Sequence, residues 1–116
     1  MNTDIKSVDI SENLRCITIT GRLDILGSES IDIKFASLAV ATGRRVVVDL
    51  SAVSFLASIG IRALISNAKA LQQRGGKMVL FVGNNANVTK TLQSTGIEPL
   101  ILMFDNFDAA VKDAQI

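Results

Sequence analysis

Residues 45–76 read RVVVDLSAVSFLASIGIRALISNAKALQQRGG, and this stretch decides the fold. The apolar run Val46–Val48, continued by Leu50, is typical of a strand buried in a parallel sheet. Farther along, apolar residues recur at steps of three and four, which places them on one face of a helix: Ile61, Leu64, Ile65, Ala68 and Leu71. The pair Gly75–Gly76 follows, and glycine ends a helix at little conformational cost. The stretch therefore predicts a buried strand, a short turn and an amphipathic helix.

The rest of the chain continues this alternation of strands and helices. In order, we expect strands at 5–10 and 14–20, a helix at 27–42, the central strand and a helix at 58–73, a strand at 77–82, a short helix carrying Val88 and Leu92, a strand at 100–104 with Pro99 at its edge, and a helix from residue 107. This order predicts an α/β fold with a mixed, mostly parallel β-sheet of about five strands, an N-terminal β-hairpin and about four helices. With 116 residues, the chain has room for one domain, residues 1–116.

Polar residues at the expected helix starts are candidate N-caps. Ser28 or Ser30 would cap the helix at 27–42, and Asp105 or Asn106 would cap the last helix. The basic pair Arg44–Arg45 closes the first of these helices, where cations favour the carboxyl end of the dipole. We prefer that interpretation to a phosphate-binding patch.

Ser58 stands at the start of the central helix and has two interpretations. As an N-cap, its hydroxyl would accept a hydrogen bond from a backbone N–H and contribute ~1 kcal/mol. As a modification site, it would carry a phosphate where free N–H groups and the helix dipole favour negative charge. Spacing alone favours the cap, because caps are common and regulatory serines are rare.

The composition leaves most kinds of enzyme chemistry unsupported. The chain has no histidine and a single cysteine, Cys16, so it cannot hold a Ser-His-Asp or Cys-His arrangement or a histidine-ligated metal. We therefore expect a non-enzymatic protein without a metal or other cofactor. Cys16 lies in a strand-like run, where a structural thiol is expected, and one cysteine indicates a reducing compartment.

Charge and hydropathy also narrow the kind of partner. The net charge is +1, and acidic and basic residues are interspersed. The sequence therefore shows no cluster of positive charge that would bind nucleic acid. No apolar run approaches the ~20 residues that span a bilayer, and the first residues are polar rather than signal-like. We expect a cytoplasmic protein that neither binds nucleic acid directly nor inserts into a membrane.

The segment VVVDLSAVSFLASIGIRALI, residues 46–65, resembles the signature of STAS-domain proteins, and specifically of bacterial anti-sigma factor antagonists. The positions that match are Phe55, Leu56, Ser58, Gly60 and Ile61. Two positions depart from the signature: Ala57 stands where the family usually has an aspartate, and Ile59 where it has a serine or threonine. Arg62 also stands where many members have a small residue. Upstream, residues 21–24 read Gly-Arg-Leu-Asp, which is similar to a second family motif, Gly-x-Leu-Asp.

The resemblance implies a phosphorylation switch that regulates transcription. The unphosphorylated protein would bind an anti-sigma factor that is also a serine kinase, Ser58 would be the phosphoacceptor, and a phosphatase would reset the switch. The docking surface would comprise Asp24, Ala57, Ser58, Ile59, Gly60, Ile61 and Arg62. Within it, Gly60 would let the backbone of the partner approach, and Asp24 would either dock or cap. The family architecture implies helices clustered on one side of the sheet.

Two other functions keep the same fold. Ala57 and Ile59 could mark a constitutive, non-phosphorylated STAS adaptor, either in a regulatory scaffold or as a cytoplasmic subunit of a lipid or anion transporter. A small-anion site at the start of the Ser58 helix is the third possibility, with Arg22 and Arg62 as its nearby basic residues. The sequence leaves open the partner's identity, the triggering signal and the oligomeric state.

Overall fold

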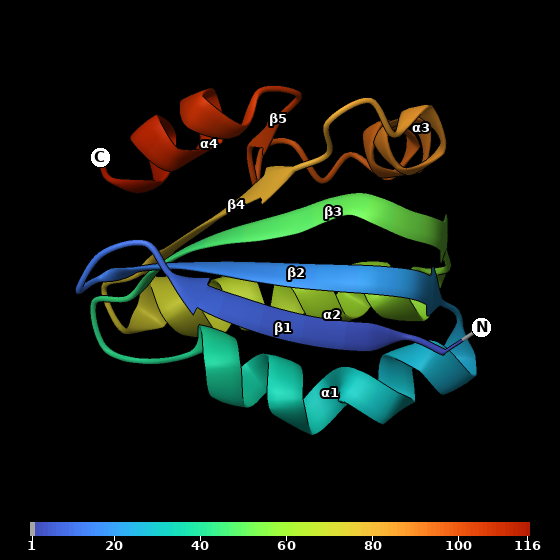
Figure 1. Ribbon diagram of the computed structural model, residues 1–116, viewed down its shortest axis with the longest axis horizontal. Helices are drawn as coiled ribbons and strands as arrows, with labels where there is room; N and C mark the ends of the chain where they lie inside the picture. Colours follow the sequence, from blue (N-terminus) through green and yellow to red (C-terminus); the bar gives the residue numbers. More distant parts are fainter. Residues whose placement is uncertain (1) are drawn as a thin grey trace.

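The computed structural model describes residues 2–116, whose five strands form one mixed sheet (Figure 1). The strands are β1 (Asp4–Asp9), β2 (Leu14–Leu23), β3 (Arg45–Leu56), β4 (Lys77–Phe81) and β5 (Met103–Phe104), and they lie in the order β1-β2-β3-β4-β5. β1 and β2 form an antiparallel hairpin, and every other neighbouring pair is parallel. The predicted fold class, with its N-terminal hairpin and mostly parallel sheet, is confirmed.

Within the same residues, four helices connect or follow these strands: α1 (Ile25–Ala39), α2 (Ser58–Gln73), α3 (Ala86–Ser94) and α4 (Phe107–Ala114). Figure 1 shows α1 and α2 on one side of the sheet and α4 on the other. α3 lies beside the second half of β3, where the Nδ2 of Asn85 donates to the carbonyl oxygen of Val53 at 2.7 Å. No helix within residues 2–116 is long and apolar enough to cross a lipid bilayer.

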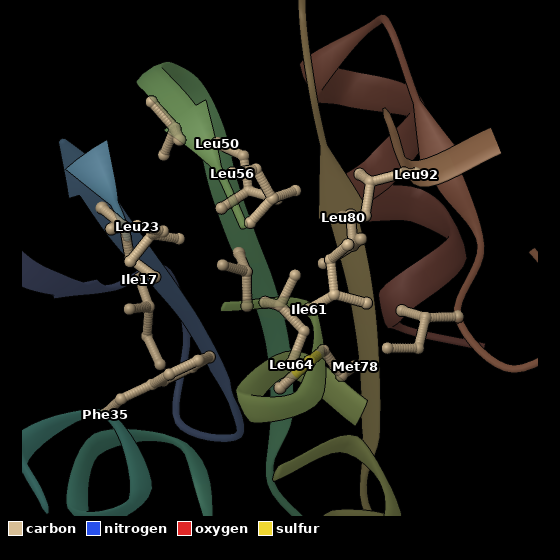
Figure 2. Close-up of a cluster of buried hydrophobic side chains, with 14 of the residues drawn as sticks. Ile17, Leu23, Phe35, Leu50, Leu56, Ile61, Leu64, Met78, Leu80 and Leu92 are labelled. Atoms are coloured by element: carbon tan, nitrogen blue, oxygen red, sulfur yellow. The ribbon is translucent and has the colours of Figure 1, made fainter. Parts of the chain in front are cut away.

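The larger hydrophobic core lies between the sheet and the helices α1, α2 and α3 (Figure 2). Alternate residues of β2, β4 and the first half of β3 enter it, as the pleat of a strand requires. Its fully buried members include Ile17, Phe35, Leu50, Leu64, Leu80 and Leu92. Each such side chain contributes about 1.5–3 kcal/mol on burial, so this layer holds the helices against the sheet.

A smaller core on the opposite face corrects the expectation that the helices cluster on one side. The intervening residues of three strands, Leu14, Val47 and Val79, point away from the larger core. Ala110 and Ala114 of α4 pack against them. A sheet face that carries buried valine and leucine needs an apolar cover, and α4 provides it over part of the sheet.

The last strand is shorter than predicted. Only Met103 and Phe104 pair with β4, and residues 98–100 form a turn that contains Pro99. The N–H of Ile101 donates to the carbonyl oxygen of Ile97 at 2.9 Å, and both of these isoleucines are buried. The prediction that a strand begins at residue 100, with the proline at its edge, was wrong. The apolar residues before Met103 lie in a turn, and its two isoleucines are buried on the same side.

The first helix begins two residues before its predicted start. Asp24 is its N-cap, so the predicted caps Ser28 and Ser30 were wrong. Ser28 lies inside the helix and is buried, and the hydroxyl of Ser30 donates to the carbonyl oxygen of Gly27 at 2.7 Å. For the last helix the cap is Asn106, which is one of the two predicted alternatives.

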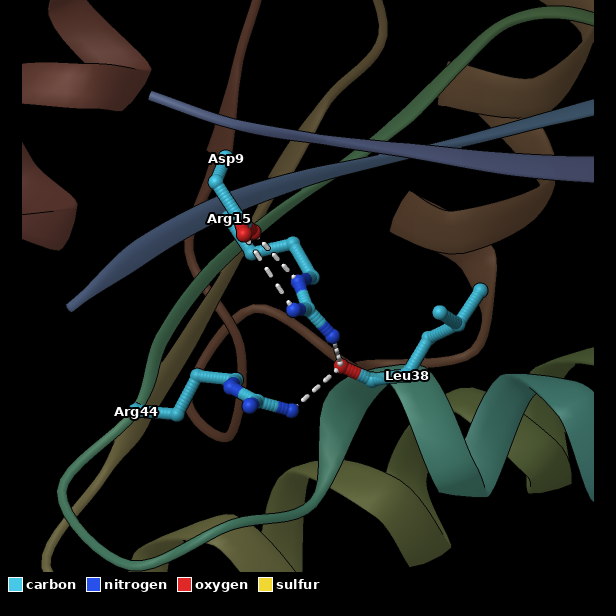
Figure 3. A network of polar contacts seen from close by, with 4 residues as sticks. All are labelled: Asp9, Arg15, Leu38 and Arg44. Atoms are coloured by element: carbon cyan, nitrogen blue, oxygen red, sulfur yellow. Dashed lines mark hydrogen bonds and ion pairs between the residues drawn. The ribbon is translucent and has the colours of Figure 1, made fainter. Parts of the chain in front are cut away.

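Basic residues close the carboxyl end of α1, as predicted for Arg44. Its Nη1 donates to the carbonyl oxygen of Leu38 at 2.9 Å, and Nη1 of Arg15 donates to the same oxygen at 3.0 Å (Figure 3). Arg15 also pairs with Asp9 at 2.6 Å, which orients its guanidinium. Arg45 does not close α1 as predicted. It is the first residue of β3, and its Nη1 donates to the carbonyl oxygen of Ala114 at 3.5 Å.

Candidate functional site

The two sequence motifs lie side by side in the structure, although residues 25–45 separate them in the chain. β2 and β3 are parallel neighbours, and their register places Arg22 opposite Phe55 and Leu23 opposite Leu56. Just beyond these pairs, the N–H of Ala57 donates to the carbonyl oxygen of Leu23 at 3.0 Å. The end of β2 and the start of α2 therefore form one corner of the molecule.

Ser58 is exposed and is the first residue of α2. The N-cap is Ala57, which cannot accept a hydrogen bond through its side chain, so the interpretation of Ser58 as the cap was wrong. In the part of the chain that the structure describes, the other three helices are capped by side chains, those of Asp24, Asn85 and Asn106. The first turn of α2 thus keeps its positive dipole end without a side-chain acceptor.

Asp24 caps α1, the helix that starts from the same corner. Its Oδ1 accepts a hydrogen bond from the N–H of Gly27 at 2.8 Å, and Nε of Arg22 donates to its Oδ2 at 3.2 Å. The bond from Gly27, followed by that from Arg22, lowers the pKa of Asp24 below its ordinary value. Of the two roles expected for Asp24, the structure shows capping.

The buried members of the predicted surface hold the corner together. An added Cβ at Gly60 would lie 2.9 Å from both Leu23 Cβ and Leu56 Cδ1. Gly60 therefore admits the close contact of α2 with the strands, rather than an approach from outside. Ile61 is also buried and belongs to the larger core. Both residues therefore pack the start of α2 against the core, beneath the surface of the corner.

The remaining predicted residues reach the surface. Arg62 is exposed, like Ser58, and Ala57 and Ile59 are half-buried. Together with Asp24 they border the uncapped start of α2. The structure thus brings all seven predicted residues into one region, five of them accessible from outside.

Sequence reasoning named Arg22 and Phe55 but missed the contact between them, and it missed two exposed apolar side chains in the same region. The guanidinium carbon of Arg22 lies 4.5 Å from the centre of the Phe55 ring, a cation–π contact on a residue pair that only the strand register reveals. Ile25 and Leu26, in the first turn of α1, are exposed apolar residues. Their signal was present in the sequence, since two large apolar residues directly follow Asp24. The corner therefore combines apolar side chains with paired charges, a composition that suits a protein partner.

The family profile that describes the STAS domain matches residues 6–110 of the chain. The chain belongs to the STAS domain family. This agrees with the resemblance carried by the two motifs, which both fall inside the matched residues.

Three solved structures show how widely this STAS fold is shared. An anti-sigma factor antagonist from Mycobacterium paratuberculosis is 18% identical, with a TM-score of 0.84 over 99% of this chain and 96% of that one. The Bacillus cell fate determinant SpoIIAA in its phosphorylated form is 16% identical, with a TM-score of 0.65 over 95% and 98%. The murine anion transporter Slc26a9 is 19% identical, with a TM-score of 0.76 over 98% of this chain but only 22% of the transporter. At these identities the comparison concerns the fold.

Proposed function

We propose that this STAS domain is an anti-sigma factor antagonist, a regulatory switch that binds an anti-sigma factor with serine-kinase activity and is controlled by phosphorylation of Ser58. The observation that carries the proposal is the exposed hydroxyl of Ser58 at the first position of a helix whose start has no side-chain cap. A kinase active site can reach such a hydroxyl without opening the core. A phosphatase would return the protein to its binding state.

The electrostatics of the corner support a phosphate as the switching group. Phosphoserine carries nearly two negative charges and three acceptor oxygens at neutral pH. At the start of α2 those oxygens meet free N–H groups and the positive end of the dipole, so the fold tolerates the charge. Within an interface the same charge must be desolvated and repels acidic groups of the partner. Switches of this kind change affinity by about 1–3 kcal/mol.

The partner would contact the accessible part of the corner. Ser58 and Arg62 present polar groups, while half-buried Ile59 offers an apolar contact. Across the junction, Arg22 stacks on Phe55, and Asp24 holds the guanidinium in place. The backbone of this surface is set by Ala57, Gly60 and Ile61. A partner would therefore contact both this backbone and the exposed side chains.

Mass spectrometry on the protein from its native host tests the proposal directly. Peptide mapping should find phosphate on Ser58, with an occupancy that differs between growth and stress. Ser58→Ala should abolish the phosphate and leave the partner permanently bound in pull-downs, while Ser66→Ala, an exposed serine on the same helix, should change neither. If Ser58→Ala leaves both phosphorylation and partner exchange unchanged, the switch is disproved.

A constitutive adaptor is the second candidate, and two observations favour it. Ala57 and Ile59 stand where antagonists resembling this chain carry polar residues. The fold is also found as a small part of the Slc26a9 transporter. An adaptor would use the same corner for docking without any modification. Absence of phosphate under every growth condition, with a partner still captured, would support this function over the switch.

A further inference from the structure

A groove of about 420 Å³ lies at the end of α2 opposite Ser58. Its walls are the last turns of α2, the first residues of β4 and the segment 100–102. α2 has 16 residues, so it extends roughly 24 Å between its two ends. The first residue of α2 that lines the groove is Ile65, roughly 10 Å along the helix from Ser58, and the groove shares no lining residue with the corner.

Large apolar residues line two sides of the groove. Ile65 and Ala68 line it from α2, and Leu100 and Leu102 line it from the other side. The exposed fractions of Leu100 and Leu102 are 59% and 48%, although both are large apolar residues. Exposed leucines beside a groove indicate a site for apolar side chains of another molecule.

The edge of β4 that faces β5 lies at the floor of the groove. The N–H groups of Leu80 and Val82 donate to the carbonyl oxygens of Leu102 and Phe104, each at 2.9 Å, so even-numbered residues of β4 face β5. Met78 is the preceding residue on this edge, and pairing with β5 begins only at Leu80. Met78 pairs with Val46 of β3 on one side, but within the described residues no strand lies on its β5 side. It lines the groove, although only 5% of the residue is exposed. An open edge of this kind accepts an added strand.

The charges around the groove are positive. Arg45, Lys69 and Lys77 line it, and no carboxylate is among its lining residues. The Nζ of Lys77 is 3.0 Å from the carboxylate of Asp113, which offsets one of the three charges. Lys69 is exposed on α2. An occupant with acidic side chains would complement the remaining charge.

We propose that this groove binds an extended segment of a partner protein, one that alternates apolar and acidic side chains and adds a strand to β4 beside Met78. Successive side chains of a strand point to opposite faces, so one set would lie against the leucines while the other meets the cations. The open backbone edge favours a peptide over a fatty acyl chain, which has no N–H groups to pair with Met78. A STAS domain built this way holds two partners at once, one at each end of α2.

A defined probe tests the strand addition. The probe is a fluorescein-labelled peptide of alternating glutamate and valine, titrated against the full chain by anisotropy. We expect saturable binding below about 1 mM, together with slower hydrogen exchange of the Met78 amide. Two versions methylated on alternate backbone nitrogens separate edge pairing from charge alone, because only the version methylated on the edge facing β4 should lose about tenfold or more in affinity. A peptide of alternating lysine and valine should not bind.

Matched variants locate the probe in the groove. Lys69→Glu should weaken binding about fivefold, while Lys90→Glu, an exposed lysine on α3, should not. Leu102→Asp should weaken binding, and Leu26→Asp, an exposed leucine on α1, should leave it unchanged; thermal melts establish that each variant is folded. Absence of saturation, equal loss with the control variants, or equal affinity of both methylated peptides would overturn the proposal. Displacement of the probe by oleate without protection of the Met78 amide would overturn it in favour of a lipid site.

Discussion

The backbone N–H of Ala57 lies 3.0 Å from the carbonyl oxygen of Leu23, and this hydrogen bond joins the end of β2 to the start of α2. Asp24 follows the acceptor and Ser58 follows the donor along the chain. α1 and α2 consequently start at the same end of the sheet (Figure 1). A partner that reaches Ser58 therefore also meets the first turn of α1, which makes the corner a composite surface rather than a single helix end.

Ala57→Asp should stabilise the fold. Ala57 already has the extended backbone of an N-cap, with φ −93° and ψ 170°, but offers no side-chain acceptor. An aspartate there would accept a bond from the first turn of α2 and contribute ~1 kcal/mol to the free energy of unfolding. Urea denaturation measures the gain. Ala57→Asn is the control without charge, and if both variants leave the midpoint unchanged, the start of α2 does not need a cap.

Gly60→Ala should destabilise the protein despite the better helix propensity of alanine. The new methyl group would lie 2.9 Å from Leu23 Cβ and from Leu56 Cδ1, both in the packed interior. Overpacking costs about 1–3 kcal/mol, against a gain of about 1 kcal/mol in propensity. Ser66→Ala, on the exposed face of the same helix, isolates the propensity effect. A higher unfolding midpoint for Gly60→Ala than for the unaltered chain would contradict the close packing.

Asp24→Ala should lower the melting temperature more than Asp24→Asn, because asparagine retains the capping acceptor and loses only the charge. The hydrogen bonds from Gly27 and Arg22 lower the pKa of Asp24 in the folded protein. Its charged form therefore stabilises the fold fully above the ordinary aspartate pKa of about 3.9, and this contribution is lost as the pH falls through the lower folded pKa. The melting-temperature difference between the unaltered chain and Asp24→Asn should shrink over that acidic range. A constant difference from pH 7 down to strongly acidic pH would contradict the assignment.

The fold could be predicted because its strongest signals are local. The apolar run at Val46–Val48 and the helical spacing from Ile61 to Leu71 each describe one element, and burial of those residues decides where it packs. The prediction of the last strand failed for the opposite reason. Ile97 and Ile101 are buried four residues apart in a turn, and a run of apolar residues does not reveal which of them face the core.

The candidate site could be predicted only in part, because its contacts depend on register. The two motifs identified Ser58 and Asp24 as candidate site residues. The contact of Arg22 with Phe55 depends on the pairing of β2 with β3, and no local sequence pattern specifies that pairing. Gly60 illustrates the same limit. A glycine early in a helix has no sequence signal that distinguishes an approach by a partner from close packing on Leu23.

Cys16 should react slowly with thiol reagents at neutral pH. It is half-buried in β2, and burial raises the pKa of its thiol, so little of the reactive thiolate is present. Alkylation by iodoacetamide, followed by mass spectrometry across pH, should show a rate profile displaced to higher pH than that of a free cysteine. The control is Ser66→Cys in a Cys16→Ser background, an exposed thiol on α2. Equal rates for the two thiols would contradict the effect of burial.

Ser58→Glu should leave the fold intact and slightly more stable. The added charge lies at the first position of α2, whose first turn has no acidic residue, and a carboxylate near a helix start contributes about 0.3–1 kcal/mol. Gln73→Glu places the same charge at the last position of the helix, where it should destabilise by a similar amount. Urea denaturation of both variants at low and high salt measures the difference, which should diminish with salt because exposed charges are screened. If Ser58→Glu unfolds the protein, a phosphate at this position would act by disrupting the fold, and a switch confined to the docking surface would be ruled out.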